Sequence, residues 1–193
     1  MRRQTSAAAD RYQAAAFLSL IIGLTLSMTS LAAATTAARG VFQSGPDFIA
    51  ECFASQPSEK KTLWLTDELR QQVSKILGHP IAGLRVRYHQ NGSKTAWILE
   101  EIGKEMPITI GVMVDNHTIQ QVKILAYRES RGGEVRYPAY TRQYQGASLK
   151  PDLSLSQSID GITGATLSVW AVNKVAALAL YFDGVVTQQR TDA

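Results

Sequence analysis

The segment from Leu84 to Tyr127 constrains the fold most, because its residues alternate between apolar and polar with the period of a β-strand. Two tight turns interrupt this alternation, Asn91-Gly92 and Asp115-Asn116-His117, and Asn-Gly is the strongest short hairpin signal. Strands joined by such short turns pair antiparallel. We therefore predict a four-stranded antiparallel meander with strands at 84–88, 95–101, 108–114 and 119–127.

A long apolar segment near the C-terminus supplies a cover for one face of this sheet. Between Ala165 and Phe182 the only charged residue is Lys174, and the apolar stripe is wide enough to be buried against a sheet. We predict a helix that starts near Ala165 and ends at Gly184, with its aromatic side chains packed in the core. A meander that packs on a C-terminal helix is an α+β fold.

Short helices are predicted before the meander. Residues 46–53 have the pattern of a short amphipathic helix that buries Cys52, the single cysteine of the chain, so no intrachain disulfide can form. Thr66 is a suitable N-cap for a second helix, and Gly78 is a suitable end for it.

The N-terminus has the composition of an export signal. No charged residue occurs between Arg11 and Arg39, and an apolar stretch ends in the small residues Ala32-Ala33-Ala34, which matches a secretory signal peptide. The stretch is also long enough for a membrane anchor, although its polar second half favours cleavage. Both interpretations place the rest of the chain in the periplasm or on the outer face of the cytoplasmic membrane. The predicted organisation is a leader at 1–34, a helical segment at 35–80 and a domain at 81–193.

Charge and histidine content exclude some functions. Three arginines and one aspartate give the leader +2 of the formal charge of +4, so the domain is only mildly basic. No arginine-rich face with interleaved aromatic residues is present, and we expect no nucleic-acid partner. His79, His89 and His117 are widely spaced and lie near turns, so we predict neither a metal site nor a catalytic constellation.

The segment that bears most on function is Asp160-Gly161-Ile162-Thr163-Gly164-Ala165-Thr166-Leu167-Ser168, a small-residue turn that leads directly into the apolar helix. Such a composition suits a close approach between the backbone and an anionic group at a helix N-terminus.

This segment resembles the flavinylation motif of the FMN-binding domain family, which includes the C subunit of the sodium-translocating NADH:quinone oxidoreductase and the G subunit of the Rnf complex. The resemblance implies that Thr166 receives FMN through a phosphoester bond made by a separate flavin transferase. A threonine hydroxyl is a poor nucleophile without a base or a metal, and no residue near Thr166 in sequence is an obvious base. Asp160 is then part of what the transferase recognises or, alternatively, a plain acidic cap.

A second glycine-containing loop, Tyr127–Arg136, precedes the motif. The carriers named above have an acidic, glycine-rich loop near the flavin, and the version here is similar to that of stand-alone exported FMN-binding proteins, as is the segment 140–146. The resemblance covers about residues 84–182. It implies a cofactor site made of Glu129, Ser130, Arg131, Gly132, Gly133, Asp160, Gly161, Thr163, Gly164, Ala165, Thr166, Leu167 and Ser168.

Three hypotheses for the function follow. The first is an exported electron carrier, not an enzyme, that bears covalent FMN and exchanges electrons with a membrane redox protein. The second is a flavin-dependent reductase of a small substrate. The third is a periplasmic adaptor without a cofactor, which leaves the Thr166 motif unexplained. A bound flavin excludes the third hypothesis, and turnover of a diffusible substrate separates the second from the first.

Overall fold

A computed structural model describes residues 40–191, and every structural statement below concerns these residues. The chain divides into two units, Met1–Ala37 and Ala38–Ala193, and the described residues all belong to the second. The predicted signal peptide or anchor at 1–34 lies outside the described residues.

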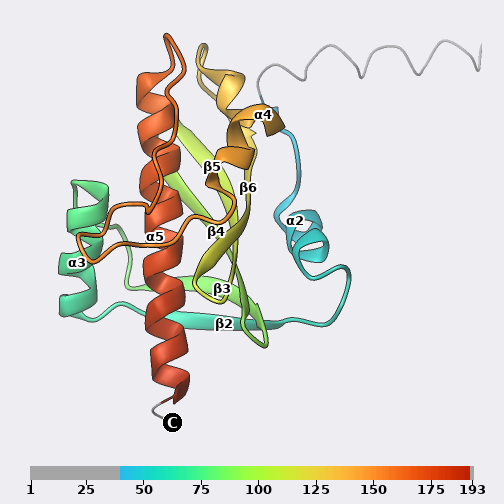
Figure 1. Ribbon diagram of the computed structural model, residues 1–193, viewed down its shortest axis with the longest axis vertical. Helices are drawn as coiled ribbons and strands as arrows, with labels where there is room; N and C mark the ends of the chain where they lie inside the picture. Colours follow the sequence, from blue (N-terminus) through green and yellow to red (C-terminus); the bar gives the residue numbers. More distant parts are fainter. Residues whose placement is uncertain (1–39, 192–193) are drawn as a thin grey trace, which may run out of the picture. The chain divides into compact units, whose positions relative to one another are not determined.

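The domain is built on one antiparallel sheet whose strand order is β1-β6-β5-β4-β3-β2 (Figure 1). The predicted meander is confirmed as its four consecutive strands β3 to β6, and two further strands extend the sheet at its edges. The strands are β1 (Gly40–Val41), β2 (Glu59–Trp64), β3 (Arg85–Asn91), β4 (Lys94–Ile102), β5 (Pro107–Asp115) and β6 (Thr118–Tyr127).

The two turns recognised in the sequence form the hairpins as predicted. Gly92 has a positive φ of 59° in the turn between β3 and β4. Asn116 and His117 have φ values of 49° and 61° between β5 and β6, the left-handed pair that a two-residue hairpin turn requires. These turns fix the register in which alternate side chains of the meander point to the same face.

The segment at 35–80, predicted as helical, contains the helices α2 and α3 and also the strand β2, which the prediction missed. Strand β2 pairs with β3 along its length, from Glu59 opposite Gln90 to Trp64 opposite Arg85. Leu63 is its only buried residue, and charged side chains are typical of an edge strand that must not pair further. The apolar alternation is therefore too weak to show this strand in the sequence.

Three longer helices accompany the sheet, α2 (Gly45–Cys52), α3 (Asp67–Leu77) and α5 (Thr166–Thr191). The predicted boundaries of α3 are confirmed, because the Thr66 hydroxyl accepts a hydrogen bond from the Leu69 N–H at 3.3 Å and Gly78 ends the helix with a φ of 77°. Between β6 and α5 the chain forms three short helical turns, η1 (Gly133–Arg136), α4 (Pro138–Thr141) and η2 (Arg142–Tyr144).

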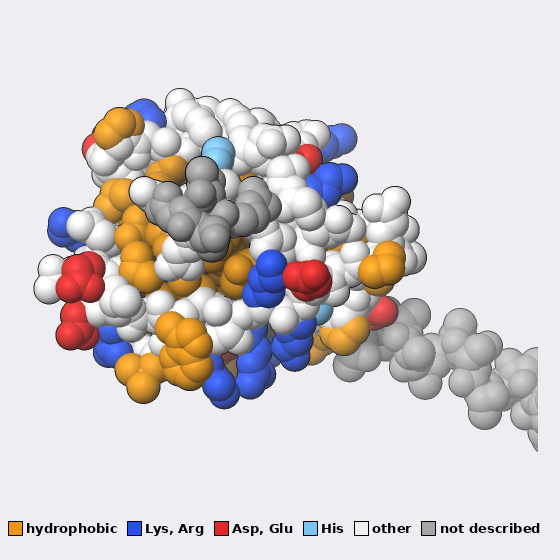
Figure 2. All heavy atoms as spheres, turned by 90° about the horizontal axis from the view of Figure 1, so that it is seen from below, with side chains coloured by type: hydrophobic (Ala, Val, Ile, Leu, Met, Phe, Trp, Pro, Cys, Tyr) orange, Lys and Arg blue, Asp and Glu red, His pale blue; other side chains and the backbone are white. Residues whose placement is uncertain are grey.

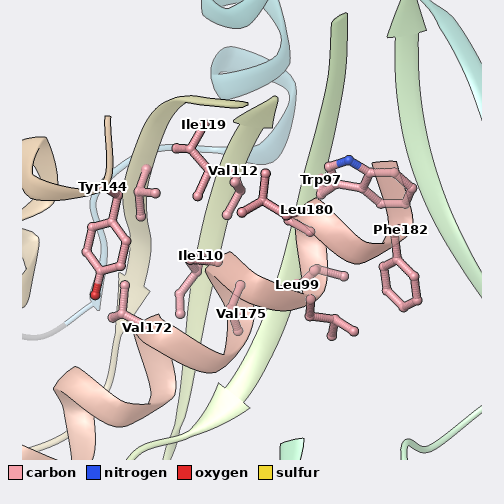
Figure 3. Packing of buried hydrophobic residues seen from close by; sticks show 14 of the residues in the cluster. Trp97, Leu99, Ile110, Val112, Ile119, Tyr144, Val172, Val175, Leu180 and Phe182 are labelled. Atoms are coloured by element: carbon pink, nitrogen blue, oxygen red, sulfur yellow. The ribbon is translucent and has the colours of Figure 1, made fainter. Parts of the chain in front are cut away.

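Helix α5 covers one face of the sheet, and α3 packs beside it (Figure 1). Ile110 and Val112 of β5 point toward α5, where Val175 lies beside Ile110, and Trp97 of β4 lies beside Phe182 of α5 (Figure 3). Each of these five side chains is fully buried. Their burial is the main source of stability in a domain of this size.

Helix α2 covers the opposite face and completes a three-layer arrangement (Figure 1). Its Phe48 lies so close to β5 that a Cβ on Gly111 would come within 2.6 Å of the ring. Cys52 is buried in the same apolar cluster, which confirms its predicted environment. Burial, followed by the nearby Glu51 carboxylate, raises the pKa of the Cys52 thiol to about 12, so the thiol is protonated.

Helix α5 is longer than predicted. Gly184 does not end it, because the apolar face continues through the buried Val186 and the helix extends to Thr191. By length and hydropathy α5 resembles a membrane span, but 67% of its most apolar stretch is buried within the domain. It is therefore the central core helix of this fold.

Candidate functional site

The candidate site lies at the start of α5. Gly164 has a φ of 81°, and a Cβ at this position would meet no atom within 4 Å. Thr166 is the first residue of the helix, and its side chain is exposed. The first N–H groups of a helix have no carbonyl partner within the helix, and the first turn of α5 contains no acidic residue. This turn can therefore accept an anionic group beside Thr166.

The loop after β6 is attached directly to this first turn. The hydroxyl of Tyr127, the last residue of β6, donates a hydrogen bond to the Arg131 carbonyl and lies 2.8 Å from the Ser168 hydroxyl oxygen. Burial raises the pKa of Tyr127, so the phenol stays protonated and available as a donor. Tyr127 thus joins the loop to the helix that carries Thr166.

Gly132 is the point of closest approach between the loop and the helix. A Cβ at this position would lie 2.8 Å from both the Ser168 Oγ and the Tyr127 hydroxyl oxygen, and the φ of Gly132 is 84°. The short distances and the positive φ both require glycine at this position. Gly133 has no such constraint, since a Cβ there would make only ordinary contacts with the Tyr127 ring at 3.7 Å.

Glu129 connects the same loop to the turn between β4 and β5. Its Oε1 accepts hydrogen bonds from three backbone N–H groups, those of Lys104 at 2.6 Å, Glu105 at 2.7 Å and Met106 at 2.9 Å. Burial raises the pKa of Glu129, but these three donors outweigh burial and the net pKa is lowered. Glu129 is thus an ionised anchor that holds the turn in place.

These three segments enclose a cavity of about 380 Å³. Its size falls within the range of small-molecule sites, about 300–1,000 Å³. The cationic side chains at its wall belong to Lys104 and Arg131, and Lys104 is also 3.4 Å from the Glu105 carboxylate. The lining residues are Lys104, Glu105, Glu129, Ser130, Arg131, Gly164, Ala165, Thr166, Leu167 and Ser168.

Most residues that the sequence assigns to the cofactor site meet at this cavity, but five do not line it. Gly132 is buried behind the wall, against Ser168, and Gly133 follows it. Asp160, Gly161 and Thr163 are exposed in the turn before the helix, where the Asp160 N–H donates to the Gln143 side-chain oxygen at 2.7 Å.

The sequence reasoning missed two residues that line the cavity, Lys104 and Glu105. They belong to an ordinary turn between paired strands, and no local pattern marks them. The hydrogen bonds to Glu129, more than twenty residues further along the chain, hold this turn at the site.

The prediction that the aromatic residues of α5 pack in the core is confirmed for Phe182 and wrong for Trp170. Phe182 is fully buried, whereas 57% of Trp170 is exposed. Trp170 lies four residues after Thr166, on the solvent side of the helix, opposite the residues that face the sheet. Leu167 is exposed beside it, at 42%.

The histidines lie away from this cavity. His79 Nε2 is 3.0 Å from the buried Glu101 carboxylate, and His117 Nδ1 is 2.8 Å from that of Asp183. Hydrogen bonds to the Pro80 carbonyl and to Glu101 raise the pKa of His79. Within residues 40–191, no group of three or more potential ligands is placed to hold a metal ion.

A larger hollow, of about 660 Å³, lies on the other face of the sheet beside α2. Its lining includes Lys60, Arg87 and His89, and it contains none of the residues of the motif or the loop. Basic side chains also gather along the lower margin of the molecule as viewed in Figure 2. We assign the ligand site to the smaller cavity, because the Thr166 motif and the loop after β6 meet there, at the start of α5.

The fold and this site define an α+β domain with a cavity at a helix N-terminus, lined by two cationic and two acidic side chains. Residues 103–181 match the model of the FMN-binding domain family. This match supports an FMN-binding domain over these residues, and with it the binding of a flavin. The match contains both the loop after β6 and the Thr166 motif. No curated protein matches the chain.

Proposed function

We propose that this protein is an extracytoplasmic electron carrier that holds FMN covalently, as a phosphoester on Thr166. The observation that carries the proposal is the position of Thr166, which is exposed at the first residue of α5 and opens onto the cavity. A phosphate on this hydroxyl would lie beside the free N–H groups of the first turn. Lys104 and Arg131 supply positive charge at the same cavity.

Attachment by a separate flavin transferase is consistent with the surroundings of Thr166. No histidine is among the residues that line the cavity. Glu129, the buried carboxylate there, accepts three backbone hydrogen bonds through Oε1. An unactivated hydroxyl needs a base or a metal to attack phosphorus, and the transferase would supply it.

When bound, FMN supplies the redox chemistry, and the residues of this chain hold and orient it. The first turn of α5 would hold the phosphate, and Leu167 offers the ring system an apolar contact. The exposure of Thr166 and Leu167 leaves the cofactor accessible to another redox protein. We propose a membrane redox protein as the donor or acceptor.

Strand β1, where the described residues begin, lies close to the proposed flavin site. Gly40 in β1 pairs with Tyr127, whose hydroxyl contacts Ser168 at the site. The chain therefore enters the domain beside the flavin site. A leader retained as an anchor would tether the domain at this end, and a cleaved leader would release it into the periplasm.

The test is coexpression with a flavin transferase, followed by flavin fluorescence in a denaturing gel. We expect fluorescence from the wild type and from Thr62→Ala, and none from Thr166→Ala. Thr62 is a suitable control, since it is an exposed threonine in β2, outside the motif and the cavity lining. Fluorescence that survives in Thr166→Ala would refute the proposed linkage. Steady turnover of a diffusible substrate by the loaded protein would favour the reductase hypothesis over the carrier.

A further inference from the structure

Trp170 is an exposed aromatic residue without a partner in the described part of the chain. The chain has three tryptophans. Trp97 is buried, with its indole N–H bonded to Thr95, and Trp64 has the Arg85 guanidinium 5.7 Å from its ring centre. Trp170 is 57% exposed, and within residues 40–191 its ring has neither an aromatic nor a cationic neighbour. Single exposed apolar residues are common on protein surfaces, so Trp170 needs a further reason to be assigned a function.

The position of Trp170 relative to Thr166 supplies one. Residues four apart on a helix lie on the same face, one turn from each other. Side chains on a helix lean toward its N-terminus, so that they cover the preceding turn. The Trp170 indole therefore lies over the turn that begins with Thr166.

In the next turn of α5 the side chains on this face contact other elements of the domain. Asn173 accepts a hydrogen bond from the Tyr144 hydroxyl at 2.6 Å, and Lys174 is 3.2 Å from the Glu101 carboxylate. Both side chains are thus bound to other elements of the domain. Trp170 and Leu167 form the exposed apolar surface next to Thr166.

We propose that Trp170 is a positioning residue that stacks against the isoalloxazine ring of the flavin carried on Thr166. This inference rests on the proposed function, because the tether fixes which turn of the helix the flavin occupies. Stacked aromatic pairs gain energy beyond the area that they bury, and the exposed indole would be covered in the flavinylated protein. The ring would then lie over the outer face of the first two turns of α5, where a partner protein can approach its edge.

Stacking on indole has a spectroscopic signature. A photoexcited flavin takes one electron from an indole in contact with it and regains its ground state when that electron returns, so emission is quenched without net oxidation or reduction. We therefore expect the tethered flavin to be weakly fluorescent in the folded protein and brighter after unfolding.

The experiment compares the fluorescence lifetime of flavin in loaded wild type, Trp170→Leu and Trp64→Leu, each folded and at neutral pH. Trp64 is a matched control, since 62% of it is exposed and it lies in β2, outside the cavity lining. We expect the lifetime to rise several-fold in Trp170→Leu and to be unchanged in Trp64→Leu. Trp170→Tyr, which keeps an electron-rich ring, should retain much of the quenching.

The outcomes of this experiment distinguish the stacking role of Trp170 from the covalent attachment of flavin to Thr166. If Trp170→Leu carries covalent flavin with the lifetime of the wild type, the stacking role is refuted and the covalent carrier stands. If the wild type carries no flavin on Thr166 although the transferase modifies a control substrate, the proposed function and the stacking role both fail. Gel fluorescence after denaturation, measured on the same samples, separates these two results.

Discussion

Gly132 lies where the loop after β6 meets the first turn of α5, and its lack of a side chain is a requirement of this contact. We predict that Gly132→Ala lowers the free energy of unfolding by about 1–3 kcal/mol, because alanine is strained at a positive φ and its methyl group would clash. Urea unfolding monitored by tryptophan fluorescence measures this change.

Gly133→Ala is the matched control for this substitution. The new methyl group would be in ordinary contact with the Tyr127 ring, at 3.7 Å, and we expect little change in stability. Equal effects of the two substitutions would show that the close contact of Gly132 with Ser168 does not hold the loop.

A second prediction concerns the contribution of Glu129 to stability. Hydrogen bonds to a charged group each contribute about 1.5–3 kcal/mol, so we expect Glu129→Gln to lower the free energy of unfolding by about that much at neutral pH. The folded pKa is lowered from the ordinary value of 4.5, and the stabilisation is therefore present above pH 4.5 and lost as the pH falls through the folded pKa.

Unfolding measured at a series of pH values tests the role of Glu129. The difference between the wild type and Glu129→Gln should shrink on acidification. A difference that is independent of pH would contradict an ionised carboxylate at this position.

Among the structural elements, the meander could be predicted from the sequence, whereas the edge strands β1 and β2 could not. Strands β3 to β6 carry strong alternation and hairpin turns, which are local signals. Strand β2 has one buried residue, Leu63, and β1 has only two residues, Gly40 and Val41. These edge strands form because the neighbouring strand offers free backbone groups, which no local pattern records.

In the candidate site, too, the individual segments could be predicted from the sequence, whereas the contacts between them could not. The motif around Thr166 and the loop around Gly132 were identified from their own residues. Their contact through Tyr127 and Ser168 depends on how β6 and α5 pack, and the turn at Lys104 is joined to them through Glu129. The sequence therefore indicated the parts of the site and not its complete wall.

A substitution at Gly184 is predicted to stabilise the protein. Glycine inside a helix is less favourable than alanine by about 0.5–1 kcal/mol. A Cβ at Gly184 would meet no atom within 4 Å, and α5 continues past it. We therefore expect Gly184→Ala to raise the free energy of unfolding by about this amount. A thermal melt that shows a lower transition temperature for Gly184→Ala would contradict a continuous helix α5.

At the scale of the whole molecule, α2 is attached to the outer face of the sheet by apolar contacts and one polar cluster. The Glu51 carboxylate lies 2.6 Å from the Lys123 ammonium and accepts hydrogen bonds from Gln43 and Gln121. The hydrogen bond from Lys123, followed by that from Gln121, lowers the pKa of Glu51 to about 2 despite partial burial.

This cluster makes the attachment of α2 sensitive to acid. The contribution of Glu51 is present above its ordinary pKa of 4.5 and is lost as the pH falls toward about 2. Because the side chain is 39% exposed, solvent screening limits this contribution to about 1 kcal/mol or less. Glu51→Gln should lower stability slightly at neutral pH, and amide hydrogen exchange in α2 should rise. Unchanged exchange would show that the apolar contacts alone hold α2.

The proposed function requires that this domain carry one flavin on one hydroxyl, that of Thr166. The most direct test is the intact mass of the protein after coexpression with a flavin transferase, with the modified peptide then sequenced by fragmentation. We predict a gain equal to the mass of FMN less one water, located on Thr166 and absent from Thr166→Ala. An unmodified chain, when the same transferase modifies a control substrate, would contradict covalent flavin attachment. A modification at another residue would refute Thr166 as the attachment site.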